Sequence, residues 1–210
     1  MVDVDALIGY LRAHRGARRG LSALSVVLAL VAVGLLAYPL LTNVYENWLQ
    51  GKLSRQLESS ELADRYRSRS LRDGDALTRI RIGKLGVETT VVHGISRSAL
   101  RAGAGHYPRS PLPCEDGNVA IAGHRTTYGK PFADIDRLQV GDAIVLDTPV
   151  GSCTYQVAAA PLVTHPNDWG VVANTPGQRT LTLTTCHPKG SARQRLVVHA
   201  RLVGSPVARA

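Results

Sequence analysis

The sequence has few aromatic residues, few cysteines and fewer acidic than basic side chains. Aromatic residues make up 5% of the 210 residues, so a core must be built mainly from Val, Leu, Ile and Ala. Three cysteines are too few for a small disulfide-rich scaffold. The chain has no internal repeat and no low-complexity tract. With 44% apolar and 20% charged residues, its composition is typical of a globular protein and excludes wholesale disorder.

Acidic residues are outnumbered: 25 Lys and Arg against 16 Asp and Glu give a net charge of +9. Such an excess indicates attraction to something anionic, either nucleic acid or a membrane or wall surface. Composition alone does not distinguish between these anionic partners. The distribution of residues along the chain does.

The longest uncharged stretch is residues 21–41, which as a helix would span roughly 30 Å, about one bilayer core. Basic residues beside a span tend to stay in the cytoplasm. Four arginines precede the uncharged stretch: Arg12, Arg15, Arg18 and Arg19. A cleaved signal peptide is the alternative, but its apolar region is usually shorter, and no convincing Ala-x-Ala site follows this run. We therefore expect a single-pass cell-membrane protein with residues 1–20 in the cytoplasm and the remainder outside, where nucleic acid is not an expected partner.

Beyond the span, composition changes twice. Residues 42–74 are polar, with interleaved charges and three leucines at rough helical spacing, and they predict an extracellular stalk, either an exposed helix or flexible chain. Residues 75–203 alternate short β-branched runs with turn residues, which predicts an all-β sandwich or barrel of seven to eight strands with short helices. Residues 204–210 are expected to be a tail. The expected strands are Leu77–Ile82, Val87–His93, Asn118–Gly123, Ala143–Asp147, Cys153–Val163, Arg179–Thr185 and Arg195–Leu202, and the expected helices are Arg97–Ala102 and Pro131–Leu138.

The three cysteines stand in different settings. Cys153 lies in a predicted strand and is expected to be an inert packed thiol. Cys114 lies in a loop, and a Cys114–Cys153 disulfide outside the cell is an alternative that the spacing does not demand. Cys186 lies where a predicted strand gives way to loop, with Arg193 and Arg195 close behind it. Because nearby cations favour the thiolate, Cys186 is the candidate nucleophile.

A second segment that could contribute a catalytic side chain is Gly123–Thr126, in which His124 follows a predicted strand. A Cys, a His and an Arg at strand ends of one barrel would supply a nucleophile, an acid/base and an anion clamp, although the sequence does not reveal their mutual geometry. A membrane-anchored binding module is the non-enzymatic alternative. Its zinc ligands would be Cys114, His124, Cys186 and His187, but no C-x₂-C or H-x₃-H pair supports such a site.

These residues carry a family resemblance. Thr182–Cys186 (TLTTC) resembles the TLxTC signature of sortases, the membrane-anchored cysteine transpeptidases of Gram-positive bacteria. Asn118–Arg125 (NVAIAGHR) resembles the segment with their catalytic His, and Arg195, nine residues after Cys186, matches their catalytic Arg. The resemblance covers roughly residues 75–203 and implies the sortase β-barrel. Cys-His-Pro after the nucleophile and the stretch GHRTTYGKPF look most like class E, the housekeeping type of high-GC actinobacteria, with classes D and F as close alternatives.

The resemblance implies cleavage of a sorting signal of LPxTG type, usually LAxTG in class E, between Thr and Gly. Cys186 would form the thioacyl enzyme, His124 would donate and later accept the proton, and Arg195 would bind the oxyanion or the substrate backbone; Arg193 is the rival of Arg195. Transfer to an amine of the wall precursor lipid II would anchor surface proteins to the cell wall. A pilin-polymerising sortase and a hydrolytic sortase-like cysteine protease are alternatives. An L,D-transpeptidase is not expected, because Leu-Thr-Thr rather than an SHGC-like run leads to Cys186.

Substrate-groove residues are expected around these three. They are Thr185, His187, Tyr107, Tyr128 and Trp169, the last in a loop that in sortases reads the sorting signal. No cofactor and no metal is expected. Some class A sortases bind calcium through clustered acidic side chains, and no such dense cluster is present in this sequence.

Overall fold

The computed structural model of the protein describes residues 13–208, with the backbone alone at residues 205 and 206. The chain divides into two compact units, Met1–Leu41 and Thr42–Ala210. The first twelve residues of the predicted cytoplasmic segment, Arg12 among them, lie outside the described residues, as do the last two of the predicted tail.

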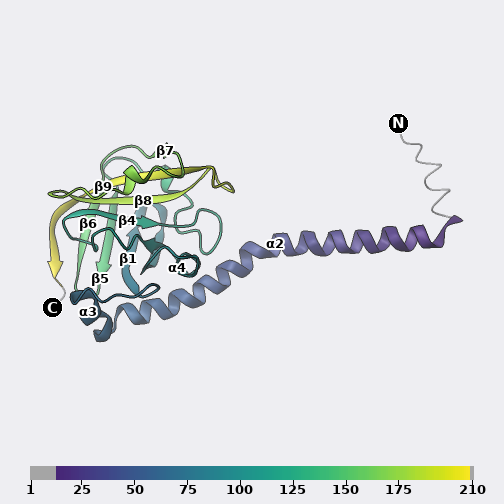
Figure 1. Ribbon diagram of the computed structural model, residues 1–210, viewed down its shortest axis with the longest axis horizontal. Coiled ribbons are helices and arrows are strands. Elements are labelled where there is room, and N and C mark those ends of the chain that lie inside the picture. The colour runs from purple at the N-terminus through teal and green to yellow at the C-terminus, as the bar shows by residue number, and fades with distance from the viewer. Residues whose placement is uncertain (1–12, 209–210) are drawn as a thin grey trace. The chain divides into compact units, whose positions relative to one another are not determined.

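From Arg15 on, the first unit belongs to helix α2, which runs from Arg15 to Leu57 (Figure 1). Its large apolar side chains between Leu21 and Leu41 are exposed. By length and composition this helix is apolar enough to cross a membrane, in agreement with the span predicted at residues 21–41.

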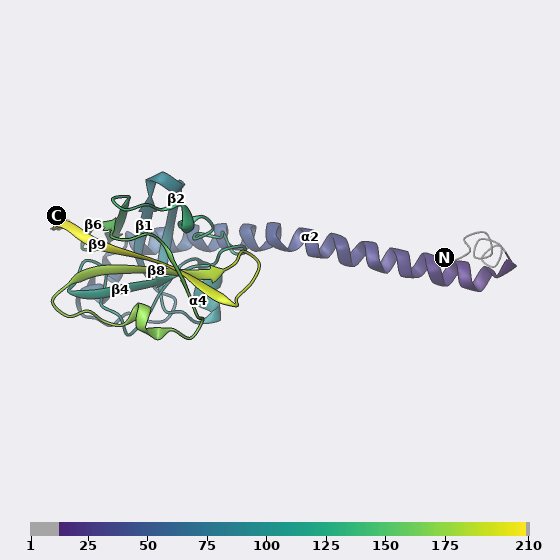
Figure 2. The ribbon, with the colours of Figure 1, turned by 90° about the horizontal axis from the view of Figure 1, so that it is seen from above.

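The second unit contains a closed β-barrel of eight strands, as predicted (Figures 1 and 2). The strands are β1 (Ala76–Ile82), β2 (Val87–His93), β3 (Gly105–His106), β4 (Gly117–Ala122), β5 (Ala143–Thr148), β6 (Gly151–Val157), β8 (Arg179–His187) and β9 (Gln194–Ala208). They pair in the order β6-β5-β1-β2-β3-β4-β8-β9, and β6 also pairs with β9, which closes the ring. A short ninth strand, β7 (Leu162–Thr164), pairs with β9 and is not part of the ring.

The barrel interior is aliphatic, as the shortage of aromatic residues predicts. Along β8, Leu181 and Leu183 are fully buried in the main core, whereas the threonines that alternate with them face the opposite side of the strand. Two aromatic rings join this core, those of Phe132 and Tyr155. Burial of each such aliphatic side chain contributes about 1.5–3 kcal/mol, so this core is the main source of the barrel's stability.

Several predicted elements differ in extent. The predicted strand Cys153–Val163 is two strands, β6 and β7, with Pro161, which has no N–H to donate, between them. The predicted helix Pro131–Leu138 contains a single 3₁₀ turn, η2 (Ile135–Arg137). The predicted helix Arg97–Ala102 is confirmed as α4, capped by Ser96, whose hydroxyl accepts from the N–H of Ala99 at 3.2 Å. The two-residue strand β3 is too short for a sequence pattern to predict.

The predicted tail is also different, because β9 continues to Ala208. Val207 and Ala208 pair with Ser152 and Gly151 at the start of β6. Up to residue 208 the expectation of a tail was therefore wrong, and this segment takes part in the closing pair of the barrel.

The predicted stalk is part of the folded domain. The end of α2 and helix α3 (Ser60–Arg67) belong to the same compact unit as the barrel. Leu53, Leu57 and Leu62 are buried in a small core that also includes Val92 of β2 and Ala99 of α4. The expectation of an exposed or flexible stalk was therefore wrong, and the three leucines at helical spacing mark the docked face.

Side-chain amides complete this docking. The amide of Gln50 donates to the carbonyls of Thr90 at 3.0 Å and Ala102 at 2.7 Å, and its oxygen accepts from the N–H of Thr90 at 2.7 Å. One turn and a half further on, Gln56 accepts from the N–H of Ala76 at 3.0 Å. Polar residues that suggested a solvated stalk therefore satisfy backbone groups of the barrel.

Cys114 and Cys153 form a disulfide, so the expectation that Cys153 is a packed free thiol was wrong. The bridge ties the loop between β3 and β4 to β6. A second contact holds the same point, because the N–H of Cys114 donates to the hydroxyl of Tyr155 at 3.1 Å. Cysteine spacing alone does not specify such a pairing, because only the folded chain brings the β3–β4 loop close to β6.

Replacing both bridged cysteines, as Cys114→Ala with Cys153→Ala, should lower the stability of the domain. The cysteines are separated by 39 residues, and a bridge closing a loop of this length contributes about 3–4 kcal/mol, chiefly by restricting the unfolded chain. We expect Tm of the detergent-solubilised full chain to fall by about 10 °C in thermal unfolding followed by circular dichroism. Cys186→Ala is the control, because that thiol is not bridged. An unchanged Tm in the double variant would contradict the prediction.

Candidate active site

Strand register brings the three candidate catalytic residues to one edge of the barrel. Strands β4 and β8 are parallel and lie side by side in Figure 2, with Ala122 opposite Thr184. Cys186 lies two residues beyond Thr184 in β8, and His124 lies two residues beyond Ala122, just after the end of β4, so both lie at the same edge of the barrel. Strand β9 runs antiparallel to β8 and places Arg195 directly opposite Cys186.

The side chains of these three residues line one cavity of about 160 Å³. Its other lining residues are Ile95, Leu100, Tyr107, Ala122, Gly123, Thr184 and Thr185. Two of the five residues expected around the site, Tyr107 and Thr185, thus line the same cavity as the thiol. The cavity combines a soft nucleophile, a titratable imidazole and a guanidinium, the groups that acyl transfer needs.

The thiol-bearing residue and the imidazole-bearing residue of this cavity, Cys186 and His124, are both half-buried. Cys186 is the free cysteine among the three. Burial lowers the pKa of His124 below its usual value, which favours the neutral imidazole near neutral pH. An imidazole with such a pKa gives up a proton readily once it has been charged, as a general acid must.

The turn that carries His124 is held against β8. The hydroxyl of Thr185 donates to the carbonyl of Gly123 at 2.7 Å, and the N–H of Gly123 donates to the carbonyl of Thr184 at 3.0 Å. Position 123 has no room for a side chain, because a Cβ there would lie 2.5 Å from the Phe132 ring. Thr185 therefore contributes to the site by positioning the turn, since its hydroxyl is already engaged.

Arg125 is a site residue whose role the sequence analysis missed. It is buried, forms an ion pair with Asp136 at 3.1 Å and donates to the carbonyl of Ala133 at 3.2 Å. Its Nη1 also donates to Nδ1 of His187 at 2.8 Å and, more weakly, to the carbonyl of Cys186 at 3.4 Å. The guanidinium thus ties the segment after His124 to the backbone of the nucleophile. The available sequence signal was its place beside His124 in the GHR run.

His187 was expected to line the substrate groove, and the structure gives it another position. Its Nδ1 accepts from Arg125, so the ring carries its proton on Nε2 when neutral. His187 is not among the residues that line the cavity of Cys186. It ends β8 next to Cys186 and is held there by Arg125.

The remaining groove candidates make different contacts. The Tyr107 hydroxyl is 3.1 Å from the Thr184 hydroxyl, and Tyr107 also lines a neighbouring cavity of about 560 Å³ that contains Trp169. That cavity is mainly apolar, and Trp169 is 64% exposed. The Tyr128 ring instead lies 5.3 Å from the His124 ring, tilted by 36°. Tyr107 and Trp169 thus belong to one groove, and Tyr128 packs on the imidazole.

Between the two candidate arginines, the cavity contains Arg195 and not Arg193. Nη1 of Arg195 donates to the carbonyls of Ala192 at 3.0 Å and Gln194 at 3.1 Å, which orients the guanidinium. Arg193 is exposed, and its Nε lies 3.4 Å from the Ser191 hydroxyl. The arginine that shares the cavity with Cys186 is therefore Arg195.

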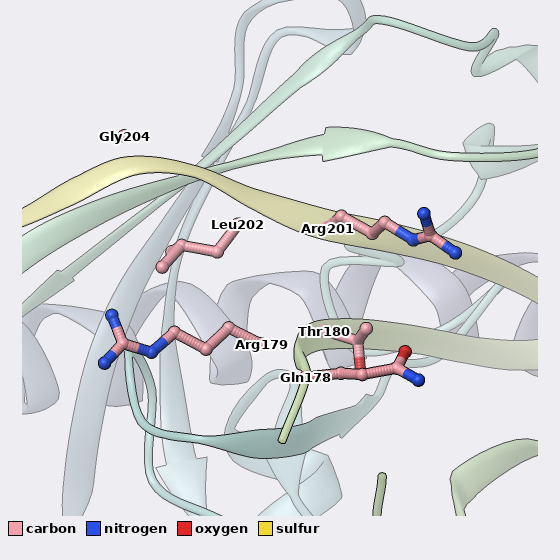
Figure 3. Close-up of a pocket in the computed structure, with 6 residues that line it drawn as sticks. All are labelled: Gln178, Arg179, Thr180, Arg201, Leu202 and Gly204. Carbon is pink, nitrogen blue, oxygen red and sulfur yellow. The ribbon is translucent and has the colours of Figure 1, made fainter. Parts of the chain in front are cut away.

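Other features of the described chain offer less chemistry. A cavity of about 510 Å³ lies at β8 and β9, but its residues include no thiol or imidazole, and the guanidiniums of Arg179 and Arg201 extend to opposite sides (Figure 3). Among residues 13–208, no group of three or more His, Cys, Asp or Glu side chains is placed to hold a metal ion. The zinc set of the binding-module alternative is not available either, because the sulfur of Cys114 is bonded to Cys153.

Comparison with known proteins gives one family throughout. Residues 80–203 match the family described as the sortase domain. The chain is 31% identical over 176 residues to sortase SrtE1 of Streptomyces coelicolor, covering 77% of this chain and 46% of the relative. It is 30% identical over 133 residues to sortase D of Bacillus subtilis, covering 62% of this chain and 65% of the relative. The chain thus spans about half to two thirds of the length of these relatives.

Solved structures agree. A sortase D5 transpeptidase of Clostridium perfringens superposes with a TM-score of 0.66 at 31% identity, over 76% of this chain and 98% of that one. Sortase SrtF of Corynebacterium diphtheriae gives a TM-score of 0.62 at 29% identity, over 67% and 90%. Sortase E1 of Streptomyces coelicolor, solved with a tripeptide in the active site, gives 0.60 at 33% identity, over 65% and 92%.

Proposed function

Because the chain belongs to the sortase family, we propose that it is a membrane-anchored cysteine transpeptidase that joins secreted proteins to an amine of the cell wall. The observation that carries the proposal is that Cys186, His124 and Arg195 line one cavity at the edge of the barrel. Transpeptidation needs a nucleophile, a proton carrier and a donor for the oxyanion, and these three side chains supply one each. The proposed substrate is a sorting signal of LAxTG or LPxTG type.

In the first half-reaction the thiolate of Cys186 attacks the carbonyl carbon of the substrate Thr. The oxyanion that forms accepts hydrogen bonds from the Arg195 guanidinium. Collapse of this intermediate breaks the Thr–Gly bond, and imidazolium His124 gives its proton to the departing glycine amine. A thioester between Cys186 and the Thr carbonyl remains.

In the second half-reaction an acceptor amine attacks the thioester carbon. Neutral His124 takes a proton from this amine, and its low pKa favours the neutral form at that stage. The new amide bond forms as the Cys186 thiolate leaves, which restores the thiolate and the protonated His124 that begin the first half-reaction. The proposed acceptor is the amine of lipid II; a lysine of a pilin subunit would make the enzyme a pilin-polymerising sortase, and water would make it a hydrolytic protease.

The apolar groove beside the cavity supports a peptide substrate. Ile95 and Tyr107 line both spaces, so a chain bound over Trp169 and Val172 leads directly to Cys186. We propose that the apolar first residue of the sorting signal lies in this groove and that its Thr lies at the thiol. An aromatic wall suits an aliphatic side chain, because burial of such a side chain contributes about 1.5–3 kcal/mol.

Two features support the proposed location. Helix α2 is apolar enough to cross a membrane, and Arg15, Arg18 and Arg19 lie at its N-terminal side, as expected of a cytoplasmic end. The disulfide between Cys114 and Cys153 suits an oxidising compartment outside the cytoplasm. We therefore propose a single-pass protein with its catalytic domain on the extracellular side.

Turnover of labelled LAxTG and LPxTG peptides by the detergent-solubilised full chain, with and without an added amine, tests the function. We expect cleavage between Thr and Gly in at least one peptide, with the amine appearing in the product. Cleavage to the free acid alone, unaffected by amine, would identify the hydrolytic alternative. Cleavage of neither peptide, or transfer that persists after a thiol reagent has modified Cys186, would contradict the proposal.

A further inference from the structure

The loop that follows His124 has an unusual backbone. Three consecutive residues, Tyr128, Gly129 and Lys130, have φ of 49°, 68° and 42°. The left-handed region costs a non-glycine residue roughly 1–2 kcal/mol, so such a run persists only where other contacts impose it. Within the loop, the N–H of Lys130 donates to the carbonyl of Thr127 at 3.0 Å. The decisive contacts come from elsewhere in the chain.

Those contacts come from α2, just after the apolar span. Oδ1 of Asn43 accepts from the N–H of Gly129 at 3.0 Å. One turn later Glu46, which is 5% exposed, lies against the same glycine, because a Cβ at position 129 would be 2.6 Å from its carboxyl carbon. Two polar residues of the membrane-proximal helix thus hold one point of the loop.

The Glu46 carboxyl fits this contact as a neutral group. Burial raises its pKa to about 7, so the protonated acid is well populated near neutral pH and packs against the glycine without a full charge. The charged groups that share its pocket are Arg79 and Glu88.

The held loop reaches the active site through Tyr128, whose ring lies 5.3 Å from the ring of His124. Further titratable groups around His124 are Cys186, Arg195 and Tyr107 in the cavity, and Arg101 of α4 lies 5.9 Å from the Tyr128 ring. Asn43, Gly129, Tyr128 and His124 therefore form a continuous chain of contacts from the membrane-proximal helix to the imidazole.

We propose that the first turns of α2 beyond the membrane span position His124, with Asn43 and Glu46 holding the loop at Gly129 so that Tyr128 stays packed on the imidazole. Asn43 and Glu46 are positioning residues and touch no substrate. The segment that leaves the membrane is thereby a working part of the enzyme and not a spacer. The catalytic consequence rests on the proposed function, because it requires His124 to carry the proton.

Asn43→Ala in the detergent-solubilised full chain tests the proposal. Loss of one hydrogen bond to the loop should lower kcat about tenfold with KM changed less than about twofold. Release of Tyr128 should admit water to His124 and move its pKa up toward the usual value, measured by NMR of labelled histidine and assigned with His124→Gln. Asn43→Asp, which retains an acceptor oxygen, should restore both values. Asn47→Ala, an exposed residue one turn further on, should change neither.

A second variant approaches the contact from the loop. Gly129→Ala would place a Cβ against the Glu46 carboxyl and disfavour the left-handed backbone. It should therefore also raise the pKa of His124 toward the usual value. In a double-variant cycle, Asn43→Ala should add little to Tyr128→Leu, because both act through one ring. Thermal unfolding of each variant identifies any that fails to fold. The variants that do fold then decide whether the contact at Gly129 positions His124.

The histidine titration separates this proposal from the proposed function. If the wild-type chain transfers no peptide, the proposed function fails, and the titration still tests the positioning. An unchanged His124 pKa in folded Asn43→Ala overturns the positioning, whatever happens to turnover. A shifted pKa with unchanged kcat overturns the claim that the contact matters for catalysis.

Discussion

Cys186→Ala is expected to abolish peptide transfer and cleavage while the barrel stays folded. Without the thiol no thioester forms, and neither the imidazole nor the guanidinium beside it can replace a covalent intermediate. We expect the rate to fall by at least about 10⁴-fold, to the detection limit. Turnover of the labelled peptide with an amine acceptor, together with circular dichroism, measures both parts of the prediction.

The matched control uses the other two cysteines. The variant in which Cys114 and Cys153 are both alanine keeps the Cys186 thiol and should retain transfer at temperatures below its lowered Tm. Thiol labelling followed by mass spectrometry should modify Cys186 in the wild-type chain and nothing in Cys186→Ala. Measurable transfer by Cys186→Ala would remove this residue from the mechanism and with it the proposed reaction.

Arg195→Ala is expected to lower kcat/KM by about 10²–10³-fold, because it removes the charged donor that lines the cavity of Cys186 and is proposed to bind the oxyanion. Strand register places Arg195 opposite Cys186, and two carbonyl contacts orient its guanidinium. Arg195→Lys keeps the charge but not the planar set of donors, so it should recover only part of the loss. Steady-state kinetics with the better of the two signal peptides measures both variants.

Arg193→Ala is the control for charge alone. Arg193 is two residues away, equally cationic and exposed, and it does not line the cavity. We expect kcat/KM to stay within about twofold of wild type, as for most exposed positions. Equal losses in the two variants would show that the net charge near the thiol matters and not the placement of one guanidinium.

Both expectations depend on strand register, and the strands themselves were largely predictable. Alternating β-branched runs bounded by Gly, Pro, Asp and Asn indicated six strands: β1, β2, β4, β5, β8 and β9. Most of their predicted ends lie within one or two residues of the observed ones. The reason is that a half-buried strand imposes a period of two on its residues. The exceptions are instructive. Strand β3 is too short to show a period, and β9 continued into a segment that lacked one.

The docked helix was misread for a physical reason. A helix that packs through leucines shows a periodic pattern, and Leu53 and Leu57 did show it. Asn43 and Gln50 instead dock by hydrogen bonds to backbone groups of the barrel, and such residues look the same in sequence as solvated ones. Composition counts them as polar in either case, so the segment resembled a stalk.

By itself the sequence determined the apolar span, the all-β domain and the candidate chemistry of Cys186, His124 and Arg195. These are local properties, because length, periodicity and residue type act over a few neighbouring positions. The tertiary structure alone decided that β4 runs parallel to β8 and that Cys186 of β8 lies opposite Arg195 of β9, which brings the three residues to one cavity. It also decided the Cys114–Cys153 disulfide and the hydrogen bond from the N–H of Gly129 to Asn43. These pairings join residues far apart in the chain, and their geometry exists only once the barrel has closed.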